Sequence, residues 1–97
     1  MTLPVILRLR AEDDVRAVIQ WYESQHPALG EDFVVRLRQT LEAIGRLPES
    51  SPLIFKSVRR ALVAKFPYAV FYVAEPTRVV VLAVLHTSRN PALWPRR

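Results

Sequence analysis

The run Val79–Leu85 is the feature of this sequence that most constrains the fold, because seven consecutive apolar residues leave it no polar face. Such a strand is expected in the centre of a sheet, with cover on at least part of both sides. Tyr68–Glu75 is a second strong strand candidate, and the proline in Glu75–Arg78 occupies the second position of a tight turn. We therefore expect Tyr68–Glu75 and Arg78–His86 to form a hairpin.

Two helical patterns precede these strands. The first is expected from residue 11 until Pro27, because apolar residues at positions 15, 18, 19 and 22 share one helical face. The second is expected over about residues 29–46, with Gly45 and Pro48 as the signals that end it. Helices joined by so short a turn should pack as an antiparallel hairpin.

The remaining segments complete the predicted order. Residues 3–9 suit a first strand, residues 48–52 a loop and residues 58–65 a strand, while the tail from about residue 87 should be irregular. We predict an α+β fold of order β-α-α-β-β-β, in which the N-terminal helical hairpin packs on one face of a small, mainly antiparallel sheet. The length of 97 residues suits one domain over 1–97.

Charge is divided unevenly along the chain. Residues 1–49 contain six arginines and eight acids, a net of −2, whereas residues 50–97 contain eight basic residues and one acid, a net of +7. Such asymmetry attracts an anionic partner. The alternative is a basic surface that serves solubility alone. We expect the sheet face opposite the helices to be open and rich in cations.

Several classes of protein are excluded by composition. Without cysteine there can be no disulfide, thiolate catalysis or cysteine-based metal site, and the two histidines lack a metal-binding spacing. Neither of the two glycines lies in a phosphate-binding loop. No apolar run approaches the roughly 20 residues that span a bilayer, and the N-terminus does not resemble a secretory signal. We expect a cytoplasmic protein with no cofactor, no metal and no membrane partner.

Arg59, Arg60 and Lys65 form the first group of candidate binding residues. Side chains alternate along a strand, so Arg59 and Lys65 share one face and Arg60 lies on the other. At most one of the two arginines can therefore face a binding groove. A guanidinium group binds phosphate or carboxylate through two parallel hydrogen bonds. Alternatively, one arginine pairs with acids on the first helix.

His86 and Arg89 follow the last strand and form the second group. A histidine whose reference pKa is near 6.5, close in sequence to a fixed cation, suits proton transfer near a phosphate. The alternative for His86 is a structural, hydrogen-bonded residue. The aromatic residues of the segment 66–72 are expected to be mostly core, although an exposed one could stack on a base.

The ordered set of these segments resembles the RelE/ParE toxin superfamily and is most similar to its ParE-like, plasmid stabilisation branch. The residues that carry the resemblance are Val58–Arg60, Phe66–Tyr72, Val81–His86, Arg89–Pro91 and Trp94, with Trp21–Tyr22 and Leu47–Pro48 in addition. It implies a toxin of a type II toxin–antitoxin system, bound in a hetero-oligomer by a cognate antitoxin with an acidic, amphipathic C-terminal segment. Arg59, Arg60, Lys65, Arg89 and Trp94 are then the candidates for contact with the target or the antitoxin.

The two branches of this superfamily imply different targets. ParE-like members inhibit DNA gyrase without being enzymes, whereas RelE-like members are ribosome-dependent, metal-independent mRNA endonucleases. The nuclease positions would correspond here to Arg60, Lys65, His86 and Arg89, but the chain has no tyrosine after Tyr72. We therefore favour the gyrase inhibitor. The nuclease is the alternative, and a non-toxic interaction module is a third hypothesis.

Overall fold

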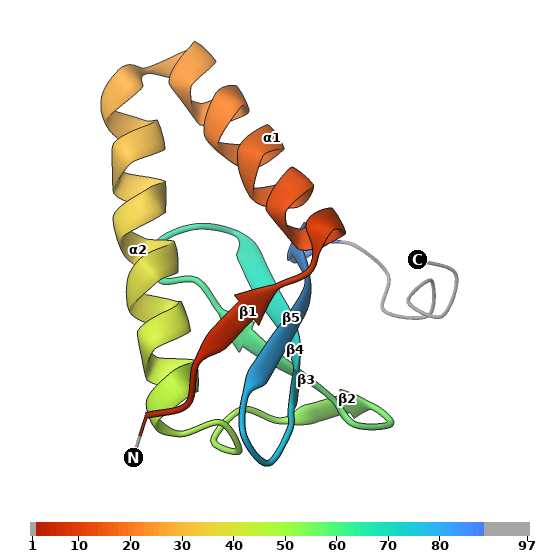
Figure 1. The fold of residues 1–97 in the computed structure, drawn as a ribbon. Coiled ribbons are helices and arrows are strands. Elements are labelled where there is room, and N and C mark those ends of the chain that lie inside the picture. The colour runs from red at the N-terminus through yellow and green to blue at the C-terminus, as the bar shows by residue number, and fades with distance from the viewer. Residues whose placement is uncertain (1, 89–97) are drawn as a thin grey trace.

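The computed structural model of the chain describes residues 2–88 (Figure 1). It contains two helices and five strands in the order β1 (Val5–Leu7), α1 (Leu9–Gln25), α2 (Pro27–Arg46), β2 (Leu53–Phe55), β3 (Val58–Leu62), β4 (Tyr68–Ala74) and β5 (Val79–His86). No helix in this part of the chain is long and apolar enough to cross a bilayer.

The strands form one sheet of order β1-β5-β4-β3-β2, in which β1 runs parallel to β5 and all other neighbours are antiparallel. The two helices form a hairpin on one side of this sheet (Figure 1). The predicted α+β class, the helical hairpin and the mainly antiparallel sheet are thus confirmed. So is the inner position of Val79–His86, which has β1 on one side and β4 on the other.

Strand β2 is an element that the sequence did not predict. It has only three residues and pairs with β3 through an irregular register, which places Leu53 opposite Arg59 and Phe55 opposite Val58. A strand so short leaves no detectable alternation in the sequence. The observed order is therefore β-α-α-β-β-β-β.

The boundaries of the helices differ from the predicted ones at their N-termini. Helix α1 begins at Leu9, and α2 begins at Pro27, which the sequence analysis assigned to the end of the first helix. Proline is favoured at the first position of a helix because its missing N–H has no partner there in any case. The Nδ1 atom of His26 accepts a hydrogen bond of 3.1 Å from the N–H of Ala28 and caps α2.

The predicted end of the second helix at about residue 46 is confirmed, but Gly45 lies buried within the last turn of α2. The backbone of the N-terminal segment passes close to it, and the N–H of Leu3 donates to the Gly45 carbonyl at 2.9 Å. A Cβ atom at this position would lie 2.9 Å from the Leu3 carbonyl oxygen. The glycine is thus explained by the close approach of β1 rather than by helix termination.

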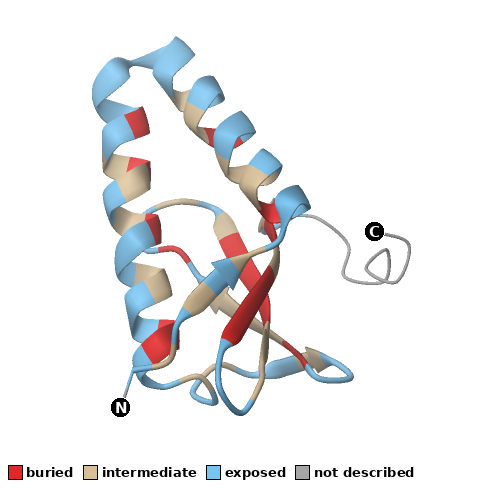
Figure 2. Ribbon diagram, in the orientation of Figure 1, coloured by how far each residue is buried: buried red, intermediate tan, exposed pale blue. Residues whose placement is uncertain are grey.

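The main core lies between the helical hairpin and the sheet, and Figure 2 shows buried residues along the inner strands and the facing sides of both helices. The largest fully buried side chains are Tyr72, Phe33, Val70, Val79, Val81 and Val84. The N–H of Val84, which lies beyond the three residues that pair with β1, donates to the Asp14 carboxylate at 3.0 Å and ties α1 to β5.

The opposite face of the sheet differs from the prediction. It carries a second apolar cluster of Val58, Ala69, Phe71 and Ala83, all of which are buried. Of the two arginines in strands β3 to β5, Arg60 alone points to this face. The prediction of a cation-rich face is therefore wrong, because small and apolar side chains of these strands occupy it.

Tyr72 provides a direct test of how the sheet holds the segment after α2. Its side chain is fully buried and its hydroxyl donates a hydrogen bond of 2.7 Å to the Pro48 carbonyl. Replacing Tyr72 by phenylalanine removes the donor and should lower the free energy of unfolding by about 1 kcal/mol. Chemical denaturation measures the change. Tyr68→Phe is the matched control, since no hydrogen bond of its hydroxyl occurs within residues 2–88; an equal loss in both variants would contradict the assignment.

Candidate functional site

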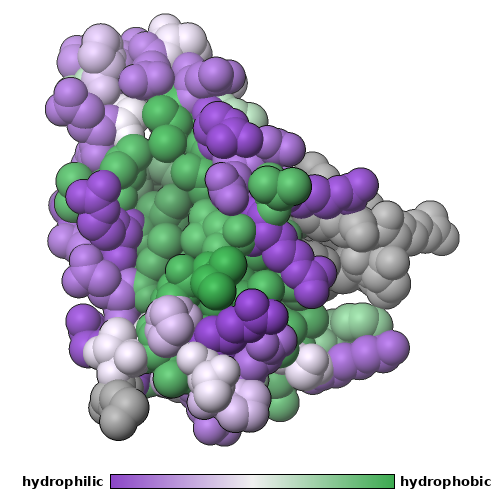
Figure 3. Space-filling view, viewed as in Figure 1, coloured by the Kyte–Doolittle hydropathy of each residue, from purple (hydrophilic) through white to green (hydrophobic). Residues whose placement is uncertain are grey.

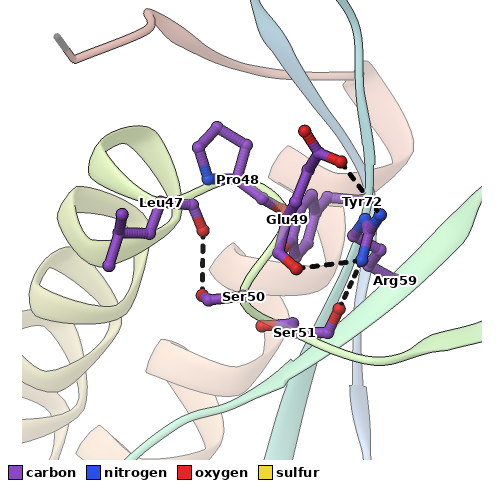
Figure 4. Close-up of polar contacts among 7 residues, drawn as sticks. All are labelled: Leu47, Pro48, Glu49, Ser50, Ser51, Arg59 and Tyr72. Carbon is purple, nitrogen blue, oxygen red and sulfur yellow. Dashed lines mark hydrogen bonds and ion pairs between the residues drawn. The ribbon is translucent and has the colours of Figure 1, made fainter.

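Arg59 is a structural arginine. Its Nη1 atom donates to the carbonyl oxygens of Glu49, at 3.1 Å, and Ser51, at 2.7 Å, and Nη2 lies 3.8 Å from the Glu49 carboxylate (Figure 4). Its side chain is 17% exposed. The guanidinium group thus holds the connection between α2 and β2 against the sheet. The alternative of an ion pair with the first helix is wrong, since the partner acid follows the second helix.

Arg60 lies on the other face of β3, as strand alternation predicted. Its neighbours in the chain define the two faces, because Val58 belongs to the apolar cluster on the far side and Ala61 packs against the main core. Arg60 also lines a cleft of about 500 Å³ between α2 and the β3 edge. No ion pair with an acid is formed by Arg60 in the described part of the chain.

Lys65 and His86 lie at one end of the sheet. Lys65 was expected in a strand, but it has a φ of 68° in the turn between β3 and β4. His86 pairs with Tyr68 across the β4–β5 ladder, and the N–H of Thr87 donates to the Pro67 carbonyl at 2.8 Å. The turn that contains Lys65 therefore adjoins the end of β5.

The His86 ring has partners in its own segment. Its Nδ1 atom accepts from the N–H of Ser88 at 3.1 Å and lies 2.8 Å from the Ser88 hydroxyl, and the ring meets Tyr68 edge to face at 5.3 Å between centroids. Because Nδ1 is an acceptor, the neutral ring carries its proton on Nε2. This arrangement suits the structural interpretation of His86, although the exposed ring leaves Nε2 available.

An aromatic cluster connects this end of the sheet to the helical hairpin. Tyr22 contacts Phe33, Phe66 and Tyr68, with ring centroids 5.0 to 6.2 Å apart. Burial, together with the neighbouring Tyr68, raises the pKa of the Tyr22 hydroxyl above its ordinary value. Trp21 meets the cluster edge to face and is 56% exposed. The expectation that Phe66 and Tyr68 are core residues fits this packing.

The cleft between α2 and β3 has a basic lining. Its lining residues are Arg36, Gln39, Thr40, Ala43, Ile44, Ser50, Ser51, Pro52, Arg60, Ala61, Leu62 and Ala64, which include two arginines and no acid. The Nε atom of Arg36 is buried and makes no hydrogen bond; it lies 3.4 Å from the Asp32 carboxylate one turn earlier. Arg36 was not predicted as a site residue, because its only signal in the sequence is this i, i+4 pair.

An apolar hollow lies between the two helices and β1. Figure 3 shows continuous hydrophobic surface there, bordered by hydrophilic side chains of both helices. The partly buried apolar residues that these elements pack against the core are Val5, Leu7, Val15, Ile19, Tyr22 and Leu41. Exposed apolar surface of this kind marks a site for a partner with an apolar face.

The residues predicted for a nuclease are only partly brought together. Lys65 and His86 lie at the same end of the sheet, whereas Arg60 lies on the face opposite to the Tyr68–His86 pair. Arg89 and Trp94 lie outside the described residues. No group of three or more potential metal ligands occurs within residues 2–88.

Comparisons with known proteins agree with this architecture. A family model described as "ParE toxin of type II toxin-antitoxin system, parDE" matches residues 5–91. A solved structure titled "Chromosomal ParDE TA system from P. aeruginosa" is similar with a TM-score of 0.77 and 12% identity, covering 88% of this chain and 96% of that chain. At this identity the likeness concerns the fold alone. The comparison with curated proteins gave no match.

The two neighbouring arginines of β3 give a matched pair of variants. Arg59→Gln removes two hydrogen bonds to backbone carbonyls and should lower the free energy of unfolding by about 1–2 kcal/mol. Arg60→Gln removes the same charge without these bonds and should change it by less than about 0.5 kcal/mol. Thermal unfolding of both variants checks the difference, and a larger loss for Arg60→Gln would refute the structural assignment of Arg59.

Proposed function

This chain belongs to the ParE toxin family of type II toxin–antitoxin systems, and we propose that it inhibits DNA gyrase and is neutralised by a cognate antitoxin. The observation that carries the proposal is the family match, which spans every strand and helix of the fold. We propose further that the whole chain acts as one toxin domain and works in the cytoplasm, where gyrase and a newly made antitoxin are found.

The geometry of the candidate residues supports binding rather than catalysis. Metal-independent RNA cleavage needs a base, an acid and a cation around one phosphate. Here Arg59 is engaged by the connection after α2, and Arg60 lies on the sheet face opposite to the His86 ring. A toxin that acts by occupying a site on its target requires no such group of side chains.

The apolar hollow between the helices and β1 supports an antitoxin with an amphipathic segment (Figure 3). A helix that lays its apolar face into such a groove would cover Leu7, Val15 and Leu41, which the isolated chain leaves partly exposed. The net charge of +5 favours an acidic partner of the same kind. The expected complex is a hetero-oligomer of toxin and antitoxin.

Expression in a bacterial host tests the proposed target. Without antitoxin, the chain should arrest growth, induce the DNA-damage response and leave DNA breaks covalently linked to gyrase. Co-expression of the gene product encoded beside it should restore growth. The control is the same plasmid with an early stop codon. Normal growth of cells that contain soluble, folded protein would favour the non-toxic interaction module instead.

One observation favours the alternative of an mRNA endonuclease: the turn that contains Lys65 adjoins the end of β5, where His86 pairs with Tyr68. Under that hypothesis His86→Ala removes the group that transfers a proton and should abolish both toxicity and cuts in translated messages. Under the gyrase hypothesis the same variant should remain toxic. Primer extension on translated messages, with DNA breaks measured in the same cells, separates the two outcomes.

A further inference from the structure

The outer edge of β3 is only partly covered. The N–H of Val63 donates to Tyr68 of β4 at 2.9 Å, so alternation directs the backbone groups of Arg60 and Leu62 away from β4. Strand β2 pairs with Val58 and Arg59 and extends no further along this edge. The part of this edge that follows Arg59 therefore has no neighbouring strand.

The connection after α2 forms only one backbone hydrogen bond with this part of β3, because the residue opposite Arg60 is a proline. The N–H of Arg60 donates to the Pro52 carbonyl at 3.1 Å, but Pro52 has no N–H to return to the Arg60 carbonyl. The N–H and carbonyl of Leu62 have no hydrogen-bond partner within residues 2–88, and the Leu62 residue is 62% exposed. Three backbone groups thus remain open, in the spacing that a further strand requires.

The other side of the sheet shows what a closed edge looks like. There, β1 pairs with β5 only as far as Val81, and the next outward N–H, that of Val84, is taken up by the Asp14 carboxylate at 3.0 Å. No side chain of the described residues accepts a hydrogen bond from the Leu62 N–H. The difference leaves the part of the β3 edge beyond Arg59 available to a partner.

Charge defines the partner that suits this edge. The cleft beside it, of about 500 Å³, is lined by Arg36 and Arg60 and by no acid. The Nε atom of Arg36 is buried without a hydrogen bond, and its acidic neighbour is Asp32, at 3.4 Å and outside the lining. A carboxylate entering the cleft would meet guanidinium donors, whereas a basic side chain would be repelled. The same lining includes the apolar residues Ile44 and Ala61.

We propose that an extended, acidic segment of a partner protein adds to the sheet as a strand beside β3, with backbone hydrogen bonds to Leu62 and Arg60 and carboxylates at Arg36 and Arg60. Strand addition supplies affinity through the backbone and selectivity through side-chain pockets. A nucleic acid fits less well, because its phosphodiester backbone offers no donor to the carbonyls of Arg60 and Leu62. Identifying the partner as the antitoxin rests on the proposed function; the binding mode itself does not.

The experiment uses the full chain, labelled with ¹⁵N, and an eight-residue peptide of repeating Glu-Glu-Val-Val, acetylated and amidated, which presents carboxylates on both faces when it is extended as a strand. Titration should give saturable shifts at the Leu62 amide and should slow its exchange with solvent. The same peptide with Lys in place of Glu should not bind. An Arg36→Gln or Arg60→Gln variant should raise the dissociation constant roughly fivefold, as expected for the loss of one exposed ion pair.

The matched control is Arg38→Gln, which removes the same charge from an exposed position of α2 that does not line the cleft and should change affinity less than about twofold. Absence of saturable binding, equal binding of the Lys peptide, or shifts that leave Leu62 unaffected would overturn the proposal. So would a single-stranded oligonucleotide that protects Leu62 in place of the peptide. The titration measures binding alone, whereas the expression experiment measures toxicity. A chain that binds the peptide at Leu62 but does not arrest growth would reject the gyrase proposal and retain this one.

Discussion

The burial of β5 between β1 and β4 is the constraint on which the rest of the structure depends. Its residues Val79, Val81 and Val84 face the helices and are fully or almost fully buried. Since a strand without a polar face must be covered on both sides, the chain needs a helical layer on one side and a second apolar cluster on the other. That requirement leaves no room for the basic face that net charge suggested. Among the described basic residues after position 50, three lie outside the strands, Arg59 binds the connection after α2, and Arg60 lines a cleft.

The sequence predicted the elements whose periodicity is long enough to be detected. The two helices and strands β4 and β5 follow from apolar spacing, and the opposite directions of Arg59 and Arg60 follow from alternation. Strand β2 could not be predicted, because three residues carry no period and its pairing is decided by Arg59 and Tyr72, which anchor the preceding segment from other strands. Contacts between residues so far apart in the chain leave no pattern in the local sequence.

The candidate site was predictable in part. His86 was recognised as a residue with two interpretations, and its contacts with Ser88 and Tyr68 suit the structural one. Arg36 was missed because it lies in a helix whose charges look like an ordinary solvated face, and only the neighbouring edge of β3 makes it part of a cleft. The family was accessible from the order of segments, whereas the target of a family member depends on surfaces that the order does not describe.

The open edge of β3 has a consequence for the chain when it is alone. An unpaired strand edge with an exposed leucine is a template on which identical chains can stack, the first step toward aggregation. Two copies meeting there would bring the guanidinium groups of Arg36 and Arg60 on one molecule toward those on the other. The same positive charges that would attract an acidic segment would therefore act as gatekeepers, keeping the protein from polymerising with itself.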